Sequence, residues 1–211
     1  MKIIEVRSLY FSEIKVIRFA RFRDQRGFFS EVYRKKDFDT HPDLSFIKGV
    51  SFVQANVSYS KKKTIRGLHF QWNPYMSKLI RVIAGEMIDL LLDIRKDSPH
   101  FGKVIAYDLS TDVGKDYNEW IWVPKGFAHG SVYLKNTFIE YFCDDVWNRK
   151  SEASISPLAP DIDWSSCEGK FKTLFDQVLS QNPLISDKDK NGFTIEDWSK
   201  NPDSENFIYS S

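Results

Sequence analysis

Short runs of β-branched and aromatic residues recur along the first two thirds of the chain. Turn-forming residues separate these runs, as at positions 24–27 (DQRG) and 124–126 (PKG). Apolar runs of this length between clusters of Gly, Pro, Asn and Asp predict β-strands, because their side chains suit a pleated, half-buried surface. The predicted strands are residues 16–22, 28–32, 50–57, 79–84, 87–94, 103–109, 120–123, 131–134 and 137–142.

The spacing of these strands bears on the fold class. Closely spaced short strands with few helices between them favour a sandwich or a barrel over a sheet of alternating strands and helices. Helical patterning is confined to residues 36–38 and 171–180. No internal repeat or low-complexity segment interrupts the series. The sequence therefore predicts an all-β fold.

The character of the chain changes after about Ser151. A stretch rich in Pro and Asp, residues 156–161, is followed from Gly169 by a polar segment. The whole chain, 211 residues, fits one domain with a short extension. We expect a domain over residues 1–168, and a C-terminal segment over residues 169–211 that lies across it with its last residues disordered. This segment is too small and too polar to form a core of its own.

Charge and hydropathy exclude several classes of partner. The chain has 30 Lys and Arg against 29 Asp and Glu, and its longest run of like charge is three lysines at residues 61–63. This offers no basic footprint for nucleic acid. The first seven residues lack the apolar core of a secretory signal, and residues 87–94 fall far short of the ~20 apolar residues that span a bilayer. We expect a cytoplasmic protein without a membrane partner. Cys143 and Cys167 are expected to be free thiols without a chemical role.

Two of the four histidines occupy places suited to chemistry. His41 and His100 lie in polar turns, whereas His69 and His129 lie beside glycine and apolar residues at strand ends. Each of the latter alone fits a buried structural residue, but the pair together favours a site. Residues 124–129 match the latter half of the pattern of cupins, whose metal-binding members supply His-x-His in the first half. Here that place reads His69-Phe70-Gln71. One ligand is missing, so we expect no metal and an acid–base role for the histidines.

Seven segments occur in an order that makes the similarity specific. They are residues 24–31, 52–58, 65–71, 78–81, 93–95, 98–102 and 126–130. Over about residues 15–190 the chain resembles the dTDP-4-dehydrorhamnose 3,5-epimerase family of metal-free cupins. The resemblance implies a cupin-type jelly-roll β-barrel that needs no cofactor. It also implies epimerisation of a nucleotide-diphosphate-linked 4-keto-6-deoxy sugar at C3, C5 or both, through an enolate, in deoxysugar biosynthesis.

The resemblance also implies roles for individual residues. His69 falls at the general base, Asp189 at the aspartate that orients it, and Tyr141 at the proton donor. Lys78 falls where the family places a cation beside the keto oxygen. The positions that match residues holding the nucleotide or the sugar are Arg26, Glu31, Gln54, Asn56, Arg66, His129, Trp147, Glu152 and Lys188. Trp147 stands where the family commonly has a tyrosine stacked on thymine, and this leaves thymine, cytosine and guanine open as the base.

Several alternatives remain at this point. One is a 3-only or 5-only epimerase, or a heptose-acting relative, that uses a CDP or GDP sugar. Another is a non-catalytic sugar-nucleotide-binding jelly roll. A third, a metal-dependent oxygenase, requires ligands that the sequence lacks. The family resemblance further implies a homodimer in which N-terminal strands extend a neighbour's sheet, with Arg26 acting in the partner's site; the edge strands of an open jelly roll give this a physical reason.

One motif resembles a calcium site. Residues 187–192 (DKDKNG) reproduce the first six positions of an EF-hand loop. The twelfth position, which requires a bidentate glutamate, is Trp198. We therefore expect no calcium there and assign Asp189 to His69.

Overall fold

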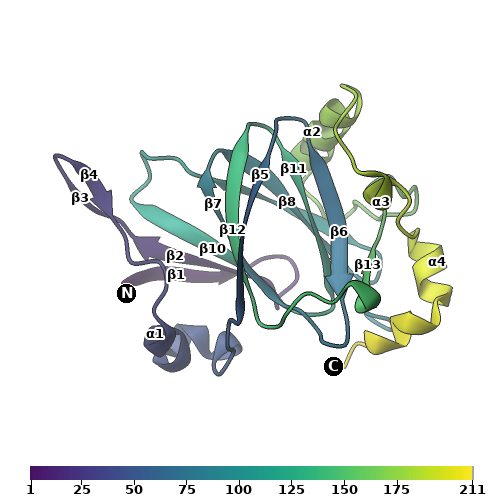
Figure 1. Ribbon diagram of the computed structural model, residues 1–211, viewed down its shortest axis with the longest axis horizontal. Helices are drawn as coiled ribbons and strands as arrows, with labels where there is room; N and C mark the ends of the chain where they lie inside the picture. Colours follow the sequence, from purple (N-terminus) through teal and green to yellow (C-terminus); the bar gives the residue numbers. More distant parts are fainter. Residues whose placement is uncertain (211) are drawn as a thin grey trace.

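Two antiparallel sheets face each other in the computed structural model, which describes residues 1–210 (Figure 1). The six-stranded sheet has the order β1-β2-β10-β7-β12-β5, and the five-stranded sheet has the order β13-β6-β11-β8-β9. A hairpin of β3 and β4 projects from the N-terminal side. The strands are β1 (Ile3–Ser8), β2 (Lys15–Ala20), β3 (Phe22–Asp24), β4 (Gly27–Phe29), β5 (Gln54–Ser60), β6 (Ile65–Gln71), β7 (Lys78–Ala84), β8 (Glu86–Asp93), β9 (Val104–Ser110), β10 (Tyr117–Val123), β11 (Phe127–Tyr133), β12 (Thr137–Cys143) and β13 (Glu152–Ser154).

Helices are short and lie outside the two sheets (Figure 1). The α-helices are α1 (Lys35–Thr40), α2 (Gly169–Leu179), α3 (Asp187–Lys190) and α4 (Ile195–Lys200). Three 3-10 turns complete the set: η1 (Pro42–Ile47), η2 (Arg149–Ser151) and η3 (Pro202–Asn206). No helix within residues 1–210 combines the length and the apolar character that crossing a membrane requires.

The predicted all-β class is confirmed, and the jelly roll consists of two open sheets rather than a closed barrel. Each predicted strand overlaps an observed one, although the run from residue 28 is a strand only to Phe29 and the run from residue 50 begins as a strand at Gln54. The prediction missed β1, β3, β6 and β13. In β6 the apolar alternation is broken, because Gly67 and inward-facing polar residues interrupt it.

The space between the sheets holds an apolar core. Side chains from both sheets meet there, among them Ile80, Leu91, Ile121 and Ile139. Each comes from a strand whose alternate residues face inward, as the period of two along a strand requires. This core fills one part of the interior, and the site described below occupies another.

The C-terminal segment covers the outer face of the five-stranded sheet. In α2 the buried residues Phe171, Phe175 and Val178 recur at helical spacing and form one apolar stripe. Trp198 of α4 is fully buried against Phe70 of β6. Near the end of the chain Phe207 packs on Trp198, and Ser211 lies outside the described residues. The disorder expected of the last residues stays a prediction.

Two glycines allow β6 and β11 to approach closely. A Cβ atom on Gly67, which has a φ of +103°, would lie 2.6 Å from the Cα atom of Gly130. A Cβ atom on Gly130 would lie 2.6 Å from the carbonyl oxygen of Arg66. Side chains at either position would push the strands apart, so glycine is required at both. This contact lies next to His69 and His129, which are paired across the two strands.

Candidate active site

A cavity of about 480 Å³ lies between the sheets, a size that suits a small-molecule ligand. One wall comes from β6 and β11 of the five-stranded sheet, and the other from β5, β7 and β12 of the six-stranded sheet. Nine of the residues named from the sequence line it: Gln54, Asn56, Arg66, His69, Lys78, His129, Tyr141, Trp147 and Glu152. The fold therefore brings together, around one cavity, residues scattered over about a hundred positions of the chain.

Behind the wall, Asp189 contacts His69. The distance between Oδ1 of Asp189 and Nε2 of His69 is 2.6 Å. Asp189 lies in α3, where the side chain of Ser186 caps the helix by accepting a hydrogen bond from the Asp189 amide. Burial by itself would raise the pKa of Asp189, but the hydrogen bond and the charge of His69, together with hydrogen bonds from Gly67 and Ser186, outweigh burial and lower the pKa. Because the ionised carboxylate of Asp189 occupies Nε2 of His69, Nδ1 of the same ring remains for proton transfer in the cavity.

The opposite wall carries a phenol and an ammonium group. Tyr141 of β12 and Lys78 of β7 belong to neighbouring strands, and in the register Tyr141 pairs with Ile80 and Cys143 with Lys78. Burial raises the pKa of Tyr141, which keeps the phenol protonated. Burial also lowers the pKa of Lys78. A proton donor and a cation thus face the base across the cavity.

Polar groups and one exposed aromatic ring surround the mouth of the cavity. Trp147 is 55% exposed, and its amide donates to Oε1 of Gln54 at 3.1 Å. Gln54 also donates through Nε2 to Oδ1 of Asn56 at 3.1 Å. Lys188 and Glu152 form an ion pair of 2.6 Å. Burial would raise the pKa of Glu152, but the hydrogen bond from Lys188 lowers it. This rim combines a stacking surface with donors, acceptors and charges.

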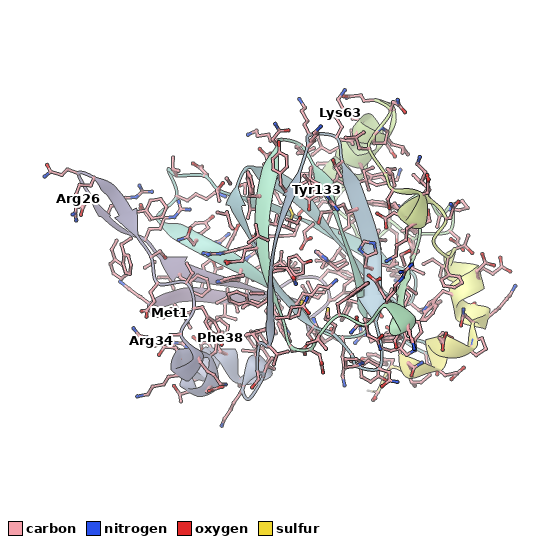
Figure 2. The ribbon with its side chains drawn as sticks, in the orientation of Figure 1. Met1, Arg26, Arg34, Phe38, Lys63 and Tyr133 are labelled. Atoms are coloured by element: carbon pink, nitrogen blue, oxygen red, sulfur yellow. The ribbon has the colours of Figure 1, made fainter. Side chains whose placement is uncertain are left out.

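Arg26 and Glu31 are the named residues that lie away from this cavity. Arg26 occupies the tip of the β3–β4 hairpin, with its side chain 85% exposed and paired to Asp24. Figure 2 shows it far from Tyr133, which lines the cavity. Glu31 binds the N-terminal ammonium of Met1 and the side chain of Arg34. Within one chain, neither residue reaches the site.

Sequence reasoning passed over several residues of the site. Ser131, Tyr133 and Cys143 line the cavity from positions where the strand alternation points inward. Asp89 is fully buried, and its Oδ1 lies 2.5 Å from Nε2 of His129. The carboxylate of Asp89 within the apolar run of β8 was the signal that could have found this residue, because a buried charge is costly unless another group compensates it.

Both cysteines are free thiols, as expected. Cys143 borders the cavity and is buried, and burial raises the pKa of its thiol to about 11. Such a thiol remains protonated at neutral pH and is a poor nucleophile.

The residues considered for metals are arranged for other contacts. Within residues 1–210 no three His, Cys, Asp or Glu side chains converge in a metal-binding group. In the segment that resembles an EF-hand, Asp189 faces His69 and Trp198 lies in the core. The calcium loop geometry is therefore absent from this part of the chain.

Comparisons with known proteins agree with this arrangement. A family model described as dTDP-4-dehydrorhamnose 3,5-epimerase matches residues 8–197. The dTDP-4-dehydrorhamnose 3,5-epimerase of Shigella flexneri is 38% identical over 176 residues, or 81% of this chain and 84% of the relative. That of Pseudomonas aeruginosa is 36% identical over 181 residues, or 83% of this chain and 87% of the relative.

A solved structure matches nearly the whole chain. The dTDP-6-deoxy-D-glucose-3,5-epimerase from Legionella pneumophila, in complex with dTDP-4-keto-L-rhamnose, aligns with a TM-score of 0.78 and 32% identity. The alignment covers 98% of this chain and 99% of the other. Because the family model spans most of the sequence and full-length relatives share more than 30% identity, this chain belongs to the dTDP-4-dehydrorhamnose 3,5-epimerase family of isomerases.

Proposed function

We propose that this protein epimerises a dTDP-linked 4-keto-6-deoxy sugar at C3 and C5, a step in deoxysugar biosynthesis. The observation that carries the proposal is the placement of the His69–Asp189 pair and Tyr141 on opposite walls of one cavity. Inversion of a carbon requires a base on one face and an acid on the other. A protein that only bound a sugar nucleotide would have no need for this pair of opposed groups.

The keto group makes the chemistry accessible to an imidazole. Protons on the carbons next to a carbonyl are acidified, and their removal gives an enolate. His69, held by Asp189 through Nε2, takes such a proton at Nδ1. Tyr141 then delivers a proton to the opposite face, and the carbon is inverted. A phenol whose pKa is raised by burial remains protonated and available for this step.

Positive charge near the carbonyl oxygen lowers the barrier to enolate formation. Lys78 extends from the wall that carries Tyr141, and Arg66 from the wall that carries His69. Arg66 is fixed by a hydrogen bond of 2.9 Å from Nε to Oγ of Ser60. Fixed cations in a partly dry cavity stabilise a developing oxyanion far better than water-exposed ones.

We place the nucleotide at the mouth of the cavity. Trp147 offers an exposed ring for stacking on the base, and Gln54, Asn56, Glu152 and Lys188 supply polar contacts around it. We assign the base as thymine, because the relatives' names specify dTDP sugars. We assign the cytoplasm as the place of action, where nucleotide sugars are built from nucleoside triphosphates.

A second copy of the chain completes the site in this proposal. The β3–β4 hairpin projects from the body and exposes Phe22, Phe28 and Phe29. A two-stranded hairpin with exposed aromatic residues is marginal in water unless a partner covers it. Docking against another copy covers these rings and lets Arg26 bind substrate in the partner's cavity. The measurement is the mass in solution, and a monomer at micromolar concentration contradicts this assembly.

Mixed dimers test whether Arg26 acts between subunits. Arg26→Ala and His69→Asn chains are co-expressed with different tags, and dimers carrying both tags are purified. If Arg26 acts on the partner's site, each mixed dimer has one intact site and about half the wild-type activity. Inactive mixed dimers place Arg26 with its own His69, which overturns the arrangement.

The reaction itself is tested by isotope exchange. The protein is incubated in D2O with dTDP-4-keto-6-deoxyglucose, and deuterium at C3 and C5 is followed by NMR. We expect exchange at both carbons and formation of the epimer, with His69→Asn as the inactive control. Absence of exchange with the dTDP, CDP and GDP sugars alike overturns the proposed function. Exchange at one carbon only identifies a 3-only or 5-only epimerase.

A further inference from the structure

The loop that carries Trp147 has no apolar anchor. It joins β12 to η2 over residues 144–148, and we call it the rim loop. No residue of the rim loop is buried, and its apolar side chains, Val146 and Trp147, are 53% and 55% exposed. The rim loop contains neither strand nor helix. Hydrogen bonds, rather than packing of these side chains, therefore fix its position.

Gln71, the last residue of β6, supplies the bonds at the centre of the rim loop. Its Nε2 donates to the carbonyl oxygens of Pro74 and Val146, each at 3.0 Å. Its Oε1 accepts a hydrogen bond from the amide of Asn148 at 2.8 Å. Gln71 is only 4% exposed. One buried side chain thus joins the rim loop to the turn that follows β6.

A side-chain amide is the group that these three partners require. The two carbonyl oxygens need N–H donors and the Asn148 amide needs an acceptor, and a glutamine presents both on one planar group. A neutral histidine, which metal-binding cupins have at this position, has one donor and one acceptor on separate ring nitrogens. Gln71 is not among the residues that line the cavity. Its amide therefore serves the rim loop and not a ligand inside the cavity.

The backbone around Trp147 is held on both sides. Gln71 binds the residue before it and the residue after it, and Oε1 of Gln54 accepts from the amide of Trp147 itself at 3.1 Å. At the start of the rim loop, Oδ1 of Asp144 accepts from the amide of Ser77 at 2.6 Å. These bonds engage the backbone and leave the Trp147 ring free at the mouth of the cavity.

We propose that Gln71 is a positioning residue for nucleotide binding, an inference that rests on the proposed function. Gln71 holds the rim loop so that the ring of Trp147 is already placed to stack on the base. Without its three bonds the loop has more conformations, and binding has to order it at the expense of affinity. Because Gln71 does not line the cavity, its loss weakens binding and leaves the chemical step unchanged.

The test uses dTDP as the ligand, since dTDP carries the base and the diphosphate without the reacting sugar. Gln71→Met keeps the length of the side chain and removes all three bonds. We expect its Kd for dTDP, measured by calorimetry, to rise about tenfold or more, which corresponds to ordering about one residue of the loop. We expect kcat with saturating dTDP-4-keto-6-deoxyglucose to change by less than about threefold.

A double-mutant cycle shows whether Gln71 acts through Trp147. Once Trp147→Ala has removed the ring, the order of the rim loop no longer matters for stacking. In that background we expect Gln71→Met to change the Kd for dTDP by less than about threefold. Equal fold-changes with and without the Trp147 ring show that Gln71 affects binding by another route, which overturns the proposal.

Thr137→Val is the matched control. Thr137 is fully buried at the other end of β12, where its hydroxyl lies within hydrogen-bond distance of backbone atoms of Glu86 and Lys135. Its loss removes bonds of the same kind and leaves the Kd for dTDP unchanged. If Gln71→Met does not fold, Gln71→Glu supplies the measurement: it keeps the shape of the side chain, loses both donated bonds and also raises the Kd.

The outcomes separate this proposal from the proposed function. An unchanged Kd in the Gln71 variants, or an equal rise in Thr137→Val, overturns the role of Gln71, and the proposed function still stands. Wild-type protein that neither binds dTDP nor exchanges deuterium at C3 or C5 overturns both.

Discussion

Asp189 and His69 are separated by 120 positions in the chain, yet an oxygen of Asp189 lies 2.6 Å from a ring nitrogen of His69. The contact exists because the C-terminal segment packs on the outer face of the five-stranded sheet and brings α3 to β6. An acid–base pair thus depends on how a peripheral segment docks. The C-terminal segment is part of the proposed catalytic site.

Removal of the charge on Asp189 tests this contact. In Asp189→Asn the amide oxygen still accepts a hydrogen bond from His69, but the negative charge that stabilises the imidazolium is lost. We expect kcat to fall about tenfold or more, with KM little changed, in a steady-state assay. Asp187→Asn is the control, since its side chain is 94% exposed two residues away. An equal loss in both variants contradicts the pairing.

Loss of the Tyr141 hydroxyl separates proton removal from inversion. Tyr141→Phe keeps the ring in the wall and removes only the proton donor. We expect epimer formation to slow about 10²- to 10⁴-fold, while deuterium exchange catalysed by His69 continues with retention of configuration. NMR reports both quantities on one sample. Tyr133→Phe, at another tyrosine that lines the cavity, retains inversion; equal behaviour of the two variants refutes the assignment.

The buried ammonium of Lys78 sets an alkaline limit on activity. Burial lowers its pKa from the ordinary value of 10.5, so the charge is lost as pH rises through a point below 10.5. We therefore expect kcat to decline with rising pH in that range. Lys78→Arg keeps a charge that does not titrate in this pH range. In this variant the decline in kcat disappears or moves to higher pH. The same decline in both proteins assigns it to another group.

Trp147 is expected to act on binding rather than on chemistry. Stacking of a base on an aromatic ring is worth about 1–3 kcal/mol, so Trp147→Ala raises KM for the dTDP sugar by about 5- to 150-fold and leaves kcat nearly unchanged. Trp147→Tyr restores most of the affinity. Tyr10→Ala removes an aromatic of similar exposure that is outside the cavity lining and serves as the control. A fall in kcat alone argues against stacking.

The packing of the C-terminal segment can be measured directly. Trp198 is fully buried and contacts Phe70, Trp72 and Phe207. Trp198→Ala lowers the free energy of unfolding by about 3–5 kcal/mol in a urea titration, and activity falls with it because Asp189 loses its support. Leu158→Ala, at a side chain that is 41% exposed, changes stability by less than about 1 kcal/mol. Similar losses in both contradict the packing described.

Most strands could be predicted from the sequence because their inward positions are apolar. β6 could not, because its inward-facing Arg66 and His69 belong to the cavity and Gly67 interrupts the run. A strand whose buried face serves the site does not show the apolar alternation on which the prediction depends. The missed strand is thus one that carries the candidate base.

The residues of the site also differ in whether the sequence alone could predict them. Sequence context singled out His69 and His129, and the family resemblance supplied the other predicted residues that line the cavity as well as the assignment of Asp189 to His69. Physical reasoning on the sequence could not have joined residues so far apart, since only the docking of the C-terminal segment brings them together. Asp89 lies within the predicted strand of residues 87–94. Its charge within an apolar run was visible, but its partner His129 was not.

The contact between Gly67 and Gly130 gives the site a rigidity that does not depend on the substrate. The spacing of the neighbouring histidines is set by backbone atoms packed against each other, rather than by a mobile loop or by side chains that could adopt other rotamers. The spacing of the backbone at the two histidines is therefore set when β6 and β11 pair. The sugar meets a wall whose two histidines are already held on a packed backbone, and little ordering of the protein on this side remains for the substrate to drive.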